Sequence, residues 1–150
     1  SVSRRGVVRG IHFADTPPGQ AKYVSVARGA GIDFIVDIRV GSPTFGTWDS
    51  VLLDADSRRS VFISEGLGHA FAALTDDATL TYLVSSTYNP AAEHDLNVLD
   101  PDIGLVFPSE LGEPVLSPKD LAAPSLAELL ASGGLPDYAE LRAYYAKATA

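Results

Sequence analysis

Short runs of β-forming residues, separated by glycine and proline turn signals, fill the chain from Val7 to Ser86. The runs are Val7–Phe13, Ala21–Arg28, Ile32–Arg39, Trp48–Asp54, Ser60–Ile63, His69–Ala73 and Thr79–Ser86. The turn signals between them include Pro17-Pro18-Gly19, Gly29-Ala30-Gly31, Gly41-Ser42-Pro43 and Asp76-Asp77. Such residues adopt backbone angles that a strand does not, so each signal ends a run. This spacing predicts an antiparallel, all-β sandwich or barrel rather than a parallel sheet with helical crossovers.

Two of these runs indicate how the strands are layered. In the run 21–28, Val24 and Val26 alternate with Tyr23, Ser25 and Ala27, which is typical of a strand with one buried face. Residues 34–36, by contrast, are Phe-Ile-Val without a polar interruption. A strand that is apolar on both faces is expected to lie between two packed layers.

After Pro108 the pattern changes to a proline-rich loop followed by short helices. Ser125 and Glu128 have the spacing of a capping box, and Gly133 and Gly134 end the helix that follows. Asp137 is placed to cap a second helix, with Leu141, Tyr144 and Tyr145 on its apolar side. We therefore expect one domain over residues 1–150, with a β core over 1–107 and loop plus helices over 108–150 packed on its outside.

Composition excludes several classes of protein. At 150 residues and 46% apolar content the chain is long enough for a core without metal or disulfide staples, and it has no cysteine for a thiolate site. No apolar run approaches the ~18 residues of a membrane span. An isoelectric point near 4.6 argues against a general nucleic-acid surface. Because no leader is visible, the cytoplasm is the expected location.

The two ends of the chain differ in charge. Residues 1–40 carry six basic and three acidic side chains, although the whole chain has a net charge of −8. This segment is either an ordinary solvated face or a site for an anionic small molecule. The chain has no methionine, even at position 1, so we expect it to be part of a longer protein.

His12 is the first candidate for chemistry. Strand alternation places it opposite Ile11 and Phe13, hence facing solvent or the interior of a barrel. A hairpin returning after residues 17–19 would bring Lys22 beside it. An ammonium group favours the neutral imidazole, which is the form that a general base needs at pH 7. A hydrogen-bonded structural histidine is the alternative reading.

The other candidates are less specific from their residues alone. His69 follows a glycine-flanked turn, which suits a ligand pocket or any tight bend. His94 lies between Glu93 and Asp95, where a solvated loop is expected. No pair of histidines has metal-ligand spacing, although scattered histidines could still meet in space. Tyr82, in an alternating strand, is either a core aromatic or a proton donor.

Four segments, in this order, resemble the dTDP-4-dehydrorhamnose 3,5-epimerase family over residues 1 to about 135. They are Arg4-Arg5-Gly6-Val7-Val8-Arg9-Gly10-Ile11-His12-Phe13, Pro17-Pro18-Gly19-Gln20-Ala21-Lys22, Asp37-Ile38-Arg39-Val40-Gly41-Ser42-Pro43-Thr44-Phe45-Gly46-Thr47-Trp48 and Glu65-Gly66-Leu67-Gly68-His69-Ala70-Phe71. The resemblance implies a cupin-type jelly roll and a homodimer without metal or organic cofactor. It implies a dTDP-4-keto-6-deoxyhexose substrate, and it would explain the basic early segment through an anionic diphosphate.

The same resemblance implies roles for individual residues. His12 matches the general base and Asp120 the carboxylate that orients it. Lys22 matches the lysine near the substrate carbonyl, and Tyr82 the proton donor on the opposite face. Arg9, His69, Tyr88 and Lys119 match groups that contact the nucleotide or the sugar. The implied reaction removes a proton next to the C4 ketone and returns one from the other side.

Three matters stay open from the sequence. The family carries an upstream segment that contributes an arginine and an aromatic residue to a site across the dimer, and this chain does not contain it. Ala30-Gly31-Ile32 and Gly68 leave open an enzyme acting at C3 only, at C5 only or at both. The alternatives to an epimerase are a metal-dependent cupin oxygenase or isomerase that uses His12 and His69, and a cupin that binds a sugar nucleotide without catalysis.

Overall fold

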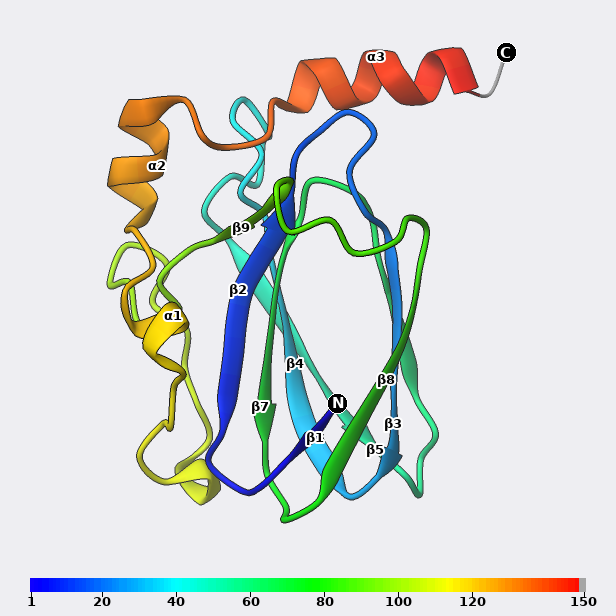
Figure 1. The fold of residues 1–150 in the computed structure, drawn as a ribbon, viewed down its shortest axis with the longest axis vertical. Helices are drawn as coiled ribbons and strands as arrows, with labels where there is room; N and C mark the ends of the chain where they lie inside the picture. Colours follow the sequence, from blue (N-terminus) through cyan, green and yellow to red (C-terminus); the bar gives the residue numbers. More distant parts are fainter. Residues whose placement is uncertain (149–150) are drawn as a thin grey trace.

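The computed structural model describes residues 1–148, which form two antiparallel sheets facing one another, with helices on the outside (Figure 1). The four-stranded sheet has the order β1-β8-β3-β6 and the five-stranded sheet the order β5-β4-β7-β2-β9. The strands are β1 (Val2–Ser3), β2 (Val8–Ala14), β3 (Lys22–Arg28), β4 (Ala30–Val36), β5 (Trp48–Asp54), β6 (Ser60–Ile63), β7 (Gly68–Ala73), β8 (Ala78–Val84) and β9 (Glu93–Asp95). The predicted all-β architecture is confirmed.

The five-stranded sheet is covered on both faces. One hydrophobic cluster lies between the sheets and includes Val24, Leu53, Phe71 and Leu80. A second cluster lies on the other face of the five-stranded sheet, where Ile11, Phe13, Phe34 and Val36 pack against the chain after β9. Its members from that later segment are Leu96, Val98, Ile103, Leu111 and Leu126. The burial of β4 on both faces confirms the layering expected from its continuous apolar run.

Most predicted strand ends are within one or two residues of those observed, and two strands match at both ends. The run 32–39 is wrong at its end, because β4 stops at Val36. The Asp37 carboxylate there accepts hydrogen bonds from the backbone and side chain of Arg39 and from Ser42 and Thr44. These bonds turn the chain out of the sheet. They also lower the pKa of Asp37 far below its ordinary value, although burial opposes the shift.

The short strands β1 and β9 and the one-turn helix α1 (Pro118–Leu121) were not predicted. The 3-10 turn η1 (Ser109–Leu111) was also not predicted. The expected loop around His94 is therefore wrong: β9 pairs with β2, and His94 Nε2 lies 2.6 Å from an Asp15 carboxylate oxygen. These elements depend on partners far away in the chain, which local patterns do not reveal.

The two predicted helices are present as α2 (Leu126–Ser132) and α3 (Tyr138–Ala148), with the capping box at α2 formed and Asp137 capping α3. Leu141 is buried and the Tyr145 hydroxyl donates to Glu65. Tyr144 is exposed, so its predicted place on the apolar side is wrong. Among residues 1–148, no helix is long and apolar enough to cross a membrane.

Candidate active site

A cavity of about 290 Å³ opens between the two sheets. It is lined by Ser1, Arg9, His12, Gln20, Lys22, His69, Phe71, Leu80, Tyr82, Val84, Tyr88 and Glu93. His12 and His69 come from the five-stranded sheet, whereas Lys22 and Tyr82 come from the four-stranded sheet. Six of the candidate residues therefore line one cavity although they come from separate parts of the sequence. They are Arg9, His12, Lys22, His69, Tyr82 and Tyr88.

A β-bulge in β2 turns both Arg9 and His12 toward this cavity. Arg9 pairs with Phe71 and His12 with His69, so three steps along β2 match two steps along β7. Simple alternation would have put Arg9 on the side of Ile11, away from His12. Gly10 makes the bulge possible: its φ is +118°, and an added Cβ would lie 2.6 Å from the carbonyl oxygen of His69.

Asp120 holds the imidazole of His12 from outside the cavity. His12 Nε2 lies 2.9 Å from Asp120 Oδ1, and Ser117 Oγ donates to Asp120 Oδ2 at 2.7 Å. Ser117 also caps α1 by accepting from the Asp120 amide, which fixes the carboxylate. Burial alone would raise the pKa of Asp120, but the hydrogen bonds from Ser117 and His12 outweigh it and lower that pKa.

Because Asp120 is held ionised, the bond to it requires the proton of His12 on Nε2. Nδ1 of the ring is then the nitrogen with a free lone pair in the neutral tautomer. Among residues 1–148, no group makes a hydrogen bond to Nδ1. This geometry suits a general base.

Tyr82 and Lys22 form the opposite wall. Along β8, Leu80, Tyr82 and Val84 line the cavity, and Tyr82 is 48% exposed. Its phenol is thus at an open edge rather than in a packed core. Burial lowers the pKa of Lys22, and the carboxylates of Glu93 and Asp33 partly oppose this shift. The cavity therefore contains a partly desolvated ammonium group and a phenol facing the imidazole side.

A second His–Asp pair lies on the same sheet as His12. His69 Nε2 is 2.6 Å from Asp33 Oδ1, and both residues are buried. Asp33 Oδ2 is enclosed and has no hydrogen-bond partner among the described residues. His69 is therefore fixed in orientation at the cavity wall, where it is available to contact a ligand.

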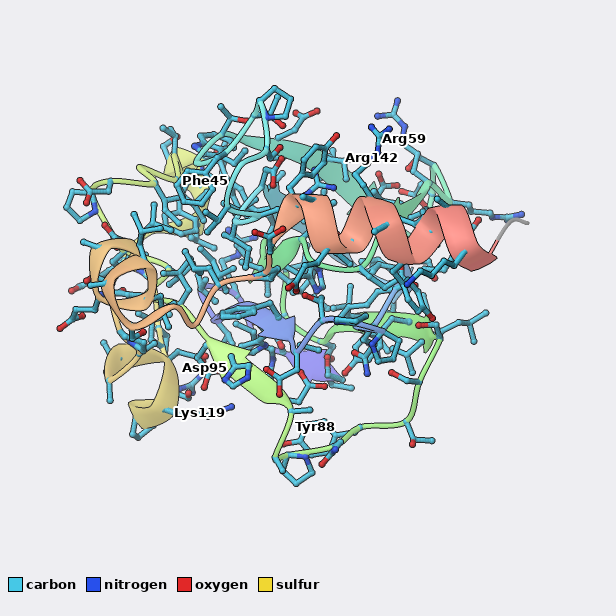
Figure 2. The ribbon with its side chains drawn as sticks, turned by 90° about the horizontal axis from the view of Figure 1, so that it is seen from above. Phe45, Arg59, Tyr88, Asp95, Lys119 and Arg142 are labelled. Atoms are coloured by element: carbon cyan, nitrogen blue, oxygen red, sulfur yellow. The ribbon has the colours of Figure 1, made fainter. Side chains whose placement is uncertain are left out.

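Lys119 lies outside the cavity lining, unlike the other candidate binding residues. Its ammonium nitrogen is 3.0 Å from Asp95 Oδ1, so α1 is tied to β9 (Figure 2). Tyr88 lies on the exposed loop between β8 and β9, and it lines the cavity although most of its surface is exposed.

The donor atoms of His12, Asp95 and Asp120 lie within 4.8 Å of one another, which is the spacing that a metal ion needs. Lys119 already places a positive charge on the Asp95 oxygen of this group. The arrangement is therefore that of a charge-paired cluster. His69, which the metal-dependent alternative requires, is bonded instead to Asp33 and is not part of the cluster.

Three acidic residues near the cavity were missed by the sequence analysis: Asp33, Glu93 and Asp95. Asp33 carried a usable signal, since it is a charged residue inside the apolar run of β4. Glu93 and Asp95 lie in a three-residue polar strand that has no such contrast with its surroundings.

Comparison with known proteins identifies close relatives. The family described as dTDP-4-dehydrorhamnose 3,5-epimerase matches residues 1–128. The dTDP-4-dehydrorhamnose 3-epimerase of Streptomyces niveus is 57% identical, over 95% of this chain and 68% of that relative. The dTDP-4-dehydrorhamnose 3,5-epimerase of Mycolicibacterium smegmatis is 58% identical, over 96% of this chain and 70% of that relative.

Solved structures show the same fold. The rmlC epimerase of Mycobacterium tuberculosis has a TM-score of 0.95 and 49% identity, covering 98% of this chain and 74% of that one. A 3'-monoepimerase from Streptomyces bikiniensis, solved in complex with dTDP-quinovose, has a TM-score of 0.92 and 52% identity, covering 96% and 72%. These likenesses confirm the cupin-type jelly roll. The chain belongs to the dTDP-4-dehydrorhamnose 3,5-epimerase family, a family of isomerases.

Proposed function

We propose that this protein epimerises a dTDP-4-keto-6-deoxyhexose at C3, at C5 or at both. The observation that carries the proposal is the pairing of His12, bonded to Asp120, with Tyr82 across one cavity between the two sheets. An epimerisation needs a base and an acid on opposite faces of the same carbon. Relatives named 3-epimerase and 3,5-epimerase are both more than 50% identical to this chain, which fits either regiochemistry.

The first step is proton removal. Nδ1 of His12 takes the proton from the carbon next to the C4 ketone, and the electron pair of that C–H bond becomes the enolate. Asp120 stabilises the imidazolium that results. A positioned base of this kind typically contributes about 10²–10⁴-fold to the rate.

The second step returns a proton on the other face. Lys22 stabilises the enolate oxygen, and loss of one such preorganised donor commonly costs about 2.7–4 kcal/mol in the barrier. Tyr82 transfers its hydroxyl proton to the carbanion carbon, which inverts the centre. The phenolate of Tyr82 then regains a proton from solvent at the open edge of the cavity. The imidazolium of His12 releases its proton to solvent. The overall exchange balances without oxidant or reductant.

Arg9, His69 and Tyr88 supply the binding contacts. Arg9 lines the cavity and is also tied to Ser3 Oγ at 3.1 Å, which places a guanidinium group where a diphosphate can be bound. His69 is oriented by Asp33 toward the sugar. Tyr88 offers an aromatic face at the rim for the nucleotide or the sugar ring. A solved relative holding dTDP-quinovose supports this substrate class.

A homodimer is part of the proposal. Tyr23, Phe62 and Leu83 are cross-strand neighbours on the outer face of β3, β6 and β8, and their exposed fractions are 50%, 64% and 71%. A contiguous row of large apolar side chains is uncommon on a monomer surface. A second copy of this chain is the occupant that the family resemblance implies. Sedimentation of the wild type and of Phe62→Lys tests it.

The decisive experiment is deuterium incorporation. The protein is incubated with dTDP-4-keto-6-deoxyglucose in D₂O, and the labelled carbons are located by NMR. Deuterium at C3, C5 or both, with inversion, supports the proposal and identifies the regiochemistry. Binding of the sugar nucleotide without any exchange would leave a binding protein and refute the enzymatic function.

A further inference from the structure

Asp95 is a second carboxylate beside the candidate base. β9 pairs with β2 in a register that sets Asp95 opposite His12, so their side chains are on the same face of the sheet. Asp95 Oδ1 is 3.5 Å from His12 Nε2, the same nitrogen that lies 2.9 Å from Asp120 Oδ1. One N–H thus faces two carboxylates, of which Asp120 accepts the hydrogen bond and Asp95 acts through its charge.

Lys119 balances that additional charge. Its ammonium nitrogen is 3.0 Å from Asp95 Oδ1, and the two side chains point toward one another between α1 and β9 (Figure 2). The Asp95 side chain is 16% exposed and that of Lys119 is 61% exposed. Asp95 Oδ1 is enclosed, and the Lys119 ammonium group lies within hydrogen-bonding distance of it. This short-range contact and the charge of Asp95 raise the pKa of Lys119.

We propose that Asp95 and Lys119 are positioning residues that act through His12, with Asp95 favouring the imidazolium form and Lys119 limiting that effect. The inference rests on the proposed function. A base must be neutral before it accepts a proton and must hold that proton afterwards. A second carboxylate near Nε2 favours the charged ring over the neutral one, and the ammonium group of Lys119 opposes that effect.

Charged groups on each neighbouring element bear on His12. They are Asp120 and Lys119 from α1, Asp95 and Glu93 from β9, His69 from β7, Lys22 from β3, Tyr82 from β8, and Arg9 from β2 itself. Asp95 and Lys119, like Asp120, lie outside the cavity lining, but only Asp120 makes the hydrogen bond that orients the ring. Changing Asp95 or Lys119 alters the charge at Nε2 and leaves the lining residues in place.

The direct test is an NMR titration of the protein without substrate. The chain has three histidines, so its ring Cε1–H signals are few, and His12→Gln and His94→Gln assign them. Asp95→Asn should move the His12 midpoint to lower pH by about half a unit to one unit. Lys119→Met should move it to higher pH, and Lys119→Arg should leave it near the wild-type midpoint. Shifts of opposite sign are the expected result.

Two matched variants control for net charge. Asp56→Asn and Lys147→Met change the charge by the same amounts at exposed positions outside the cavity lining. The inference is overturned if the His12 midpoints of Asp95→Asn and Lys119→Met equal those of the controls. It is also overturned if both midpoints move in the same direction. A wild-type His12 signal that titrates only after treatment with a chelator also overturns it, because a bound metal would then occupy the cluster.

The kinetic test uses the acid limb of kcat/KM for deuterium exchange. This limb should move to lower pH in Asp95→Asn and to higher pH in Lys119→Met, as in the NMR titration. Loss of a merely structural contact would lower kcat without moving the limb. Wild-type protein that exchanges no deuterium refutes the proposed function. If the wild type is active but the acid limb stays at the same pH in both variants, this inference is refuted and the proposed function is not.

Discussion

Asp120 lies 2.9 Å from His12 Nε2 although 108 positions of the sequence separate the two residues. Asp120 belongs to a one-turn helix outside the two sheets, whereas His12 is on β2, next to the edge strand β9. The contact holds the Nε2 atom of a residue that lines the cavity, and Nδ1 makes no hydrogen bond among residues 1–148. The C-terminal segment therefore completes a site whose other parts lie on the strands.

Replacing Asp120 by Asn tests this relationship. An amide that turns its NH₂ group toward Nε2 favours the proton on Nδ1, which removes the lone pair needed for proton abstraction. We expect kcat/KM to fall by about 10²–10⁴-fold while the fold is retained. Asp102→Asn, at an exposed position, is the control and should keep wild-type rates. Equal rates for the two variants would show that Asp120 does not orient the base.

Tyr82→Phe should separate the two proton transfers. His12 remains able to remove a proton, so substrate hydrogen should still wash out into D₂O. Inversion should be lost, because the proton can return only from the side of His12. NMR of the recovered sugar measures both quantities. Tyr88→Phe keeps the aromatic face at the rim and should leave inversion intact, and a Tyr82→Phe enzyme that inverts normally would assign the acid to another group.

Lys22 should set an alkaline limit on the reaction. Burial lowers the pKa of Lys22 from its ordinary 10.5, so its ammonium form is lost at a lower pH than that of a free lysine. Because the charged form stabilises the enolate, wash-out should decline as pH rises through this lowered pKa. The measurement is made in the Tyr82→Phe background, where the phenol of Tyr82 cannot contribute. Adding Lys22→Arg, which stays charged, should move the decline to higher pH.

Chelation separates the epimerase from a metal-dependent cupin. In the proposed mechanism His12, Lys22 and Tyr82 carry every proton and charge, so no Lewis acid is required. Dialysis against EDTA should leave the rate of deuterium exchange unchanged, and elemental analysis of the active protein should find less than one metal per chain. Activity that disappears with EDTA and returns with one divalent metal would favour the metal-dependent alternative.

The fold was predictable where local chemistry decides it. The strands β5 and β6 match at both ends because apolar or β-branched runs there meet clear turn signals. The capping box of α2 was likewise visible in its own residues. β9 was not predictable, since Glu93–Asp95 has no apolar pattern and is ordered by its pairing with β2.

The site divides in a similar way. Alternation with Ile11 and Phe13 predicted that His12 faces either solvent or the interior of a barrel, and in the structure His12 lines the cavity. The pairing of Asp120 with His12 was implied by family resemblance and by no local signal, because it joins two distant segments. Strand alternation could not predict that Arg9 lies on the same face as His12, because the bulge at Gly10 reverses the face on which Arg9 lies. Both features depend on the folded chain, which brings Asp120 to His12 and reverses the face of β2 on which Arg9 lies.

Gly10→Ala tests whether the bulge builds the site. An added Cβ would lie 2.6 Å from the His69 carbonyl oxygen and 2.7 Å from Ala70 Cα, both backbone atoms that cannot easily move. The positive φ of +118° adds strain, of the order of 1–3 kcal/mol. We expect a loss of more than about 2 kcal/mol in the free energy of unfolding, measured with urea.

Gly41→Ala is the matched control for this substitution. Its φ of +83° is also positive, but an added Cβ would meet nothing within 4 Å, so it should cost only about 1–2 kcal/mol. The two variants should also differ in function: Gly10→Ala should lose exchange activity even under conditions where it is folded, because β2 must shift away from β7 and His12 with it. If Gly10→Ala were no less stable and no less active than Gly41→Ala, the close approach of β2 to β7 would not be what holds Arg9 and His12 on one side of the sheet.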